Sequence, residues 1–177
     1  MILRVTQKLA KKIKVAPKVT LPRDSNPFAD WAAHLFTADR TQYILLTNSA
    51  SLYSVIFYGR GISESDIFID RVLSALRDFM VDAGHGPVFE RCIVPAASEI
   101  LLCKTGDRSL LGSMNDHIHC AKAHLLCESP FEAGHKLNST PMGAIGYRFP
   151  NDMLVEQAGM SELAKNTGAK IIPFRRK

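Results

Sequence analysis

The chain has 177 residues, of which 46% are hydrophobic and 22% charged, a composition typical of one globular domain large enough to bury a core. No apolar run reaches the roughly 18 residues of a membrane-spanning helix, and the first residues lack the charged-then-apolar order of a signal peptide. These features exclude a helical membrane span and lead us to expect a cytoplasmic protein. The four cysteines lie in apolar contexts, so we expect reduced thiols.

The net charge of +5 is concentrated at the two ends of the chain. The basic residues at the ends are Lys8, Lys11, Lys12, Lys14 and Lys18 near the start, and Arg175, Arg176 and Lys177 at the finish. Basic ends suit contact with nucleic acid or another polyanion. The same pattern also fits a solvated helix face followed by a frayed tail.

The first third of the chain predicts two strands in a hairpin, preceded by shorter elements. Residues 2–5 alternate like a strand, and residues 6–14 indicate a short basic helix. Prolines then mark an extended connector up to residue 27. Apolar residues on one side of residues 27–37 predict a helix. Residues 42–48 and 51–58 are strand-like and joined by a short link, which predicts a β-hairpin over 42–58.

The remainder of the chain alternates helices with one strand. The predicted elements are a helix over 63–83, a strand over 99–104, and helices over 107–127, 130–138 and 150–158. Residues 88–95 stay ambiguous. We therefore predict a single α+β domain over residues 1–160, with a small, mostly antiparallel sheet covered by helices, and a basic tail over 161–177. A parallel strand pair stays open, because a long helix separates the hairpin from the later strand.

The join between the strand at 99–104 and the following helix carries a concentration of polar groups. Lys104, Arg108, Ser109 and Ser113 surround the helix start, where free amide groups and the helix dipole favour an anion. These four residues are therefore candidates for anion binding. Alternatively, Asp107 or Thr105 caps the helix and Arg108 pairs with a nearby acid.

A second face of the same helix is rich in cysteine and histidine. Cys120, His124 and Cys127 are spaced three or four residues apart, a spacing that a helix can offer to zinc. Because Cys120 and Cys127 are about 10 Å apart along the axis, one helix supplies only two ligands. The remaining ligands would have to come from Cys92, His85 or His34. Cys120, His124 and Cys127 are therefore only weak metal candidates. The alternative is that they are ordinary packing and edge residues.

Further polar candidates lie at the hairpin and along the long helix. They are Arg40, Asn48, Asn115 and Asp116. Arg108 and Asp116 are eight residues apart, so they project away from each other and should not pair. We expect a structural partner for Asp116, either a backbone donor or a cation such as Arg40. For Arg108 we expect a functional role, since a cation at a helix N-terminus needs an anion.

Several segments together resemble an uncharacterised family of small bacterial proteins that contain a domain of unknown function. The matching segments include 30–32, 39–40, 46–48, 104–105, 108–116 and 140–142. The string Arg-Ser-x-Leu-Gly-Ser-Met-Asn-Asp at 108–116 is the most specific of them. The resemblance implies a compact single-domain bacterial protein, and Cys120, His124 and Cys127 lie outside its pattern.

Two functional hypotheses follow from these features. The first is a small binding or regulatory protein that contacts a polyanion such as nucleic acid, and the second is a hydrolase or transferase acting on a phosphate-bearing small molecule. In the second, Lys104 and Arg108 would hold the anion while Asp116 or His117 served as acid or base. No nucleophile can be named, and no cofactor is predicted beyond a remote possibility of zinc.

Overall fold

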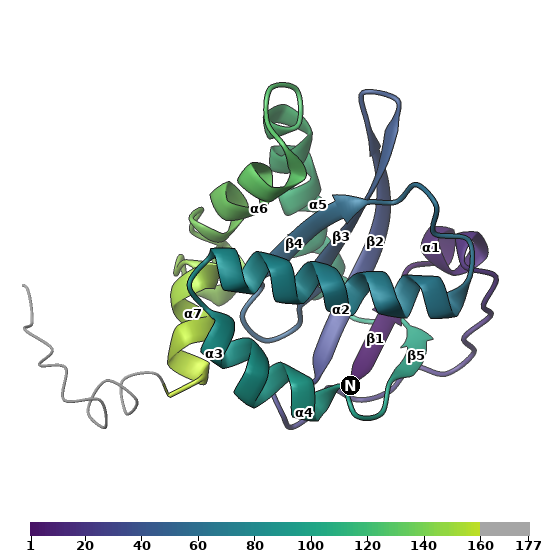
Figure 1. The fold of residues 1–177 in the computed structure, drawn as a ribbon, viewed down its shortest axis with the longest axis horizontal. Helices are drawn as coiled ribbons and strands as arrows, with labels where there is room; N and C mark the ends of the chain where they lie inside the picture. The colour runs from purple at the N-terminus through teal and green to yellow at the C-terminus, as the bar shows by residue number, and fades with distance from the viewer. Residues whose placement is uncertain (160–177) are drawn as a thin grey trace, which may run out of the picture.

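A computed structural model describes residues 1–159 and contains one five-stranded sheet in the order β4-β3-β2-β1-β5 (Figure 1). The strands are β1 (Ile2–Val5), β2 (Asp30–Ala38), β3 (Thr41–Asn48), β4 (Ser54–Tyr58) and β5 (Leu101–Lys104). Strands β2, β3 and β4 form an antiparallel meander, while β1 is parallel to both β2 and β5. The α+β class is as predicted. The sheet is mixed rather than mostly antiparallel, because β1 is parallel to both of its neighbours.

Helices cover both faces of the sheet. They are α1 (Gln7–Lys12), α2 (Ser65–Asp82), α3 (Gly86–Val88), α4 (Val94–Ala96), α5 (Arg108–His124), α6 (Pro130–Asn138) and α7 (Pro150–Gln157), with a π-helical turn η1 (Phe89–Ile93) and a 3-10 turn η2 (Gly143–Ile145). In Figure 1, α2 crosses one face of the sheet and α5 lies behind the other. One hydrophobic core joins α1 and α2 to the sheet, and a second core joins α5 and α6 to the opposite face.

The predicted hairpin and long helices are confirmed, but the helix predicted over 27–37 is wrong. Residues 30–38 form strand β2, which is buried on both faces because it lies in the middle of the sheet. Such a strand lacks polar alternation, so the spacing of Phe28, Trp31 and Leu35 imitated a helix. The ambiguous residues 88–95 are helical turns. The predicted basic tail lies outside the described residues.

The pairing register places a row of mostly polar residues across the sheet face that α5 covers. Cys103 is opposite Arg4, Arg4 is opposite Ala32, Ala32 is opposite Thr47, and Thr47 is opposite Ser54. Alternation along each strand sends these side chains toward α5 rather than toward α2. The row therefore places polar groups from β5, β1, β3 and β4 on the same face of the sheet.

Candidate functional site

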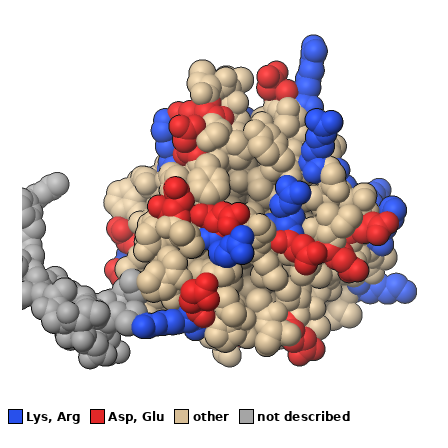
Figure 2. All heavy atoms as spheres, viewed as in Figure 1, with Lys and Arg blue, Asp and Glu red and all other residues tan. Residues whose placement is uncertain are grey.

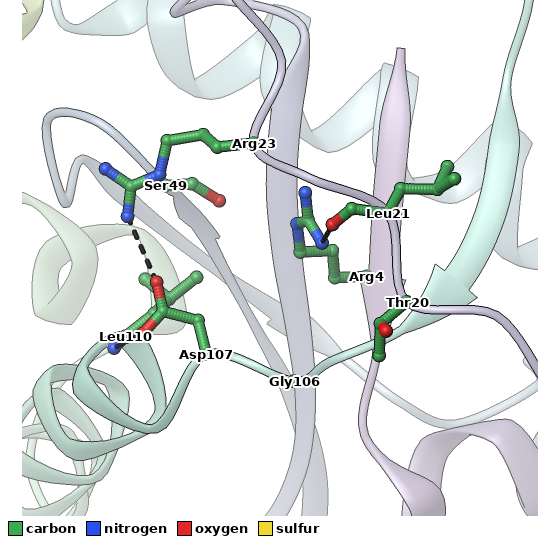
Figure 3. Close-up of a pocket in the computed structure, with 8 residues that line it drawn as sticks. All are labelled: Arg4, Thr20, Leu21, Arg23, Ser49, Gly106, Asp107 and Leu110. Atoms are coloured by element: carbon green, nitrogen blue, oxygen red, sulfur yellow. Dashed lines mark hydrogen bonds and ion pairs between the residues drawn. The ribbon is translucent and has the colours of Figure 1, made fainter.

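At the β5–α5 join, a cleft of about 250 Å³ lies between the 20–23 connector and the start of α5 (Figure 3). Asp107 is the N-cap of α5, and its carboxylate accepts hydrogen bonds from the backbone amides of Ser109 at 2.9 Å and Leu110 at 3.1 Å. These bonds hold the pKa of Asp107 below its ordinary value. The predicted cap is thus confirmed at Asp107, and the helix terminus already carries a negative group. The other part of that alternative, an acidic partner for Arg108, is wrong for the described residues.

The four candidate anion-binding residues do not converge on this cleft. Ser109 and Ser113 lie together in an adjoining hollow of about 80 Å³, where the Ser113 hydroxyl donates to the Ser109 carbonyl at 3.3 Å. Arg108 is exposed and, within residues 1–159, its side chain forms no hydrogen bond or ion pair. Lys104 lies at a different hollow beside α1. Ser109 and Ser113 therefore lie together, but neither Lys104 nor Arg108 lies with them.

The cation at the mouth of the cleft is Arg23, which sequence reasoning missed. Its Nη2 lies 3.2 Å from Oδ2 of Asp107, so the side chain bridges from the connector to the start of α5 (Figure 3). Arg23 and Ser49 line both the cleft and the adjoining serine hollow. Arg23 lies within the proline-rich connector, which has no regular pattern. The sequence therefore gives no signal that this side chain reaches the start of α5.

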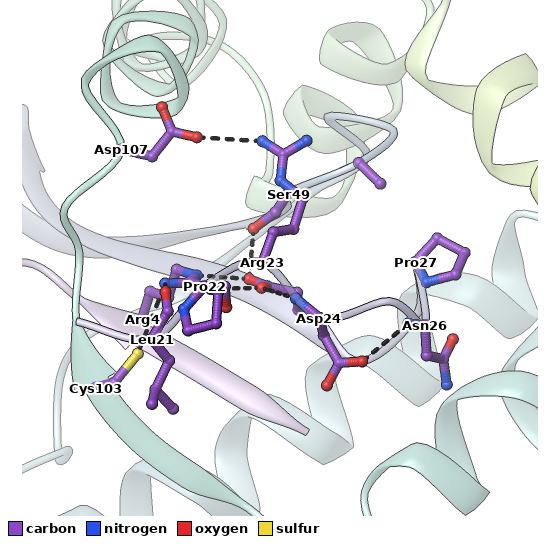
Figure 4. A network of polar contacts seen from close by, with 12 residues as sticks. Arg4, Leu21, Pro22, Arg23, Asp24, Asn26, Pro27, Ser49, Cys103 and Asp107 are labelled. Carbon is purple, nitrogen blue, oxygen red and sulfur yellow. Dashed lines mark hydrogen bonds and ion pairs between the residues drawn. The ribbon is translucent and has the colours of Figure 1, made fainter. Parts of the chain in front are cut away.

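Arg4, which lines the cleft, belongs to a buried ion pair between β1 and β2 (Figure 4). The Arg4 side chain donates Nε to Oδ1 of Asp30 at 2.7 Å and Nη2 to Oδ2 at 2.6 Å. Its remaining N–H groups reach the Leu21 and Pro22 carbonyls, both at 2.8 Å, and the sulfur of Cys103 at 3.9 Å. Every donor of Arg4 is thereby used, so its role is to tie the connector to the sheet.

The Asp30 carboxylate is equally saturated. Beyond Arg4, it accepts from the Ser49 hydroxyl at 2.7 Å and from the Asp24 amide at 3.0 Å. Burial alone would raise the pKa of Asp30, but these hydrogen bonds outweigh it and hold the pKa below its ordinary value. The carboxylate therefore stays ionised inside the protein and is not available to a ligand.

The remaining polar candidates are divided between structure and open surface. Asn48 is structural, because its Nδ2 donates to the Pro27 carbonyl at 2.8 Å and its Oδ1 accepts from the Ala50 and Ser51 amides. Asn115 and Asp116 are exposed on α5. No partner for the Asp116 side chain occurs in the described part of the chain, so the expected pairing with Arg40 or a backbone donor is wrong.

A buried polar chain lies further along the same face of the sheet. The Thr47 and Ser54 hydroxyls are 2.8 Å apart, and Oγ of Ser54 is 2.8 Å from Nδ1 of His117. All three side chains are buried. Burial lowers the pKa of His117 to about 4, against a smaller opposing effect of the neighbouring Asp116 carboxylate. His117 therefore faces the core as a neutral group, whereas Asp116 faces solvent, and the two do not share a site.

The weak metal candidates do not come together. Nδ1 of His124 lies 3.5 Å from Oε2 of Glu128, while Cys120 is half-buried and Cys127 is exposed. Over residues 1–159, no group of three or more His, Cys, Asp or Glu side chains is placed to hold a metal ion. Zinc binding by this helix stays a prediction.

Cations instead gather around two hollows that flank α1. We call the first the hairpin hollow. It measures about 830 Å³ and is lined by Lys12, Arg40, Thr41, Gln42, Tyr58, Arg60 and Gly61. The second, the α1 hollow, measures about 390 Å³, and its basic residues are Lys11, Lys18 and Lys104. Neither lining contains Asp or Glu. Figure 2 shows Lys and Arg side chains at the top and right of this view, with acidic side chains beside them.

Local backbone geometry places the cations of the hairpin hollow. Asp39 and Arg40 form the two-residue turn between β2 and β3, with φ values of 41° and 62°. Gly59, the first residue after β4, lies so close to β3 that an added Cβ would be 3.3 Å from the Gln42 carbonyl oxygen. Gly61 has a φ of 80°, in the left-handed region. These glycines let the chain turn on either side of Arg60. The α1 helix completes the rim, where Nζ of Lys12 donates to Oε1 of Gln42 at 2.9 Å.

Comparison with known proteins identifies the family. None of the helices in residues 1–159 has the length and apolar content needed to cross a bilayer. Among curated proteins, none matches the chain. A family model described as a domain of unknown function, DUF6933, matches residues 2–153. The match covers most of the chain, and the protein therefore belongs to the DUF6933 family.

Proposed function

We propose that this protein binds a polyanion such as nucleic acid through the basic surface formed by the hairpin hollow and the α1 hollow. The observation that carries the proposal is the composition of the two linings: six cations, Lys11, Lys12, Lys18, Arg40, Arg60 and Lys104, and no carboxylate. Adjacent residues of α1, Lys11 and Lys12, line one hollow each, so the two hollows share this helix. A group of cations of this kind is the electrostatic feature expected of a phosphate-binding surface.

The charge distribution along the chain supports the same surface. Residues 1–23 contain seven Lys or Arg and no Asp or Glu. Three of these cations are paired with an acid: Arg4 with Asp30, Lys14 with Glu64 at 3.1 Å, and Arg23 with Asp107 at 3.2 Å. Lys11 and Lys18 have no ion-pair partner in the part of the chain that the structure describes. Unpaired cations beside hollows are free to contact phosphates and release counterions.

The alternative, a hydrolase or transferase at the β5–α5 join, has less support. Asp107 occupies the helix terminus that would receive a phosphate, and Arg23 pairs with it. The acid or base residues suggested for it, Asp116 and His117, face different environments. The polyanion hypothesis therefore accounts for more of the geometry.

An electrophoretic shift assay with random-sequence DNA and RNA at low and high salt tests the proposal. The variant Lys11→Glu/Lys12→Glu reverses two charges on the helix that both hollows share. The matched control is Lys122→Glu, an exposed lysine on the unrelated helix α5. We expect binding by the wild type at low salt, weakening at high salt, and loss of binding in the α1 variant alone. No shift at low salt, or equal binding by the wild type and the α1 variant, would overturn the proposal.

A further inference from the structure

The α1 hollow lies at the carboxyl ends of two neighbouring parallel strands. Val5 is the last residue of β1 and Lys104 is the last residue of β5, the register sets them opposite each other, and both line the hollow. The chain then leaves the two strands toward opposite faces of the sheet, since α1 joins the core shared with α2 and α5 joins the core on the other face. Ligands commonly bind at such a point, in the crevice outside the carboxyl ends of parallel strands.

One wall of this hollow is the segment that folds back after α1. Lys14 has a φ of 57°, and the amide of Val15 donates to the Ala10 carbonyl at 3.0 Å, so the chain reverses directly after the helix. Further along, the Lys104 amide donates to the Val19 carbonyl at 3.0 Å, which fixes the connector beside β5. Residues 16–18, between these two hydrogen bonds, all line the hollow. The wall is therefore held at both ends by main-chain hydrogen bonds.

The lining combines apolar side chains with unpaired lysines. Its apolar residues are Val5, Ala10, Val15, Ala16 and Pro17, its cations are Lys11, Lys18 and Lys104, and the remaining residue is Gln7. Within residues 1–159, none of these three ammonium groups forms a hydrogen bond or an ion pair. The lining contains no aromatic ring on which a base could stack. An aliphatic chain, in contrast, would be removed from water against the apolar side chains while an anionic head met the lysines.

We infer that the α1 hollow binds a small amphipathic anion, an alkyl phosphate or alkyl carboxylate, with its chain on the apolar side chains and its head held by the lysines. The volume of about 390 Å³ lies within the range of roughly 300–1,000 Å³ that is usual for small-molecule pockets. The ligand would share three lysines with the proposed polyanion surface. It does not need the hairpin hollow, and it uses the apolar residues, which a phosphate backbone leaves uncovered.

Isothermal titration calorimetry with four probes below their micelle-forming concentrations tests the inference. The probes are octyl phosphate, octanoate, inorganic phosphate and octyl glucoside, which carries the same chain on a neutral head. The variant Lys104→Ala removes one ammonium group, and Ala16→Trp, at an exposed position of the wall, fills the hollow. The matched controls are Lys122→Ala and Ala123→Trp, at exposed positions of α5 outside both hollows. Thermal melts of each variant report whether it is folded.

We expect at least one of the two amphipathic anions to bind the wild type about 10-fold more tightly than inorganic phosphate or octyl glucoside, because chain and head both contribute. The tighter of the two identifies the head group. Lys104→Ala should weaken its binding about 10-fold, and Ala16→Trp should abolish it, while both controls bind as the wild type does.

If neither amphipathic anion binds more tightly than inorganic phosphate, or if the folded Lys104→Ala and Ala16→Trp variants bind it normally, the inference is wrong. The polyanion proposal is measured separately, by the electrophoretic shift of nucleic acid with the Lys11→Glu/Lys12→Glu variant. Failure of one therefore does not imply failure of the other.

Discussion

Arg4 and Asp30 form a buried ion pair in which both oxygens of the carboxylate receive a hydrogen bond from one guanidinium, at 2.7 Å and 2.6 Å. The pair connects β1 to β2, and through the Leu21 and Pro22 carbonyls it also holds the connector. Removing one partner would leave the other charge buried without compensation. Such a loss costs about 3–5 kcal/mol, which is far more than the pair adds relative to an apolar replacement.

We therefore expect Arg4→Met to lower the free energy of unfolding by about 3–5 kcal/mol in urea denaturation. The control is Arg23→Met, which removes the exposed Arg23–Asp107 pair and should cost less than about 1 kcal/mol. Equal losses in the two variants would show that the Arg4 network is not a buried structural tie.

His117 should make the fold less stable as the pH falls from about 6.5 to 4. Its pKa is lowered to about 4 by burial in the folded state, while the unfolded chain takes up a proton near pH 6.5. In this window the unfolded state binds more protons, so stability decreases by up to about 3 kcal/mol. The lowered pKa of Asp30 acts in a more acidic window: its contribution is present above the unfolded value near 3.9 and is lost as the pH falls through the folded value.

Chemical denaturation at a series of pH values measures the His117 effect. The variant His117→Gln cannot titrate, and its stability should depend less steeply on pH between 6.5 and 4.5. His119→Gln, an exposed histidine on the same helix, serves as the control and should keep the wild-type slope. A wild type whose stability is flat across this range would contradict the assignment.

Asn138 pairs with the backbone of β4, an outer strand of the sheet. Its Oδ1 accepts from the Ser54 amide at 2.7 Å, and its Nδ2 donates to the Ser54 carbonyl at 2.9 Å, so a side chain of α6 pairs with β4 as another strand would. Asn138→Ala would leave both backbone groups buried and unpaired, at a cost of about 2–3 kcal/mol. Thermal denaturation measures it against Asn115→Ala, an exposed asparagine whose loss should be near neutral. A change no larger than that of the control would refute the edge-pairing role.

Arg40 in the hairpin turn should lower the stability of the fold while contributing to polyanion binding. Asp39 and Arg40 both adopt left-handed backbone angles, which cost an L-residue about 1–2 kcal/mol. Asn and Gly are the residues usually found at these positions of a two-residue turn. Arg40→Gly should therefore raise stability by about 0.5–1 kcal/mol while weakening polyanion binding. Arg40→Ala separates the two effects, because it removes the guanidinium but keeps a Cβ. It should lose binding without the gain in stability, and a gain equal to that of Arg40→Gly would argue against backbone strain.

Helices and their ends could be predicted from local patterns in the sequence. The residues that strand pairing and tertiary contacts bring together could mostly not be predicted. The capping signal at Asp107 and the helix over 130–138, which begins at Pro130 and ends at Asn138, were visible because helix ends have local signatures. Strand β2 was not, because a central strand buried on both faces has no polar alternation. The hairpin hollow combines α1, a turn and a Gly-Arg-Gly segment. No local pattern in the sequence indicates that these three segments meet, because only the tertiary arrangement brings them together.

The most direct test of polyanion binding at the hairpin hollow is the salt dependence of the dissociation constant. Each phosphate contact contributes about 0.7 to 0.9 to the slope of log K against log salt concentration. If Lys12, Arg40 and Arg60 each hold a phosphate, the triple alanine variant should lose about 2 from the slope measured for the wild type by anisotropy. The double control Arg71→Ala/Lys122→Ala, at exposed cations outside both hollows, should keep the wild-type slope. Identical slopes for the wild type and the triple variant would contradict the account.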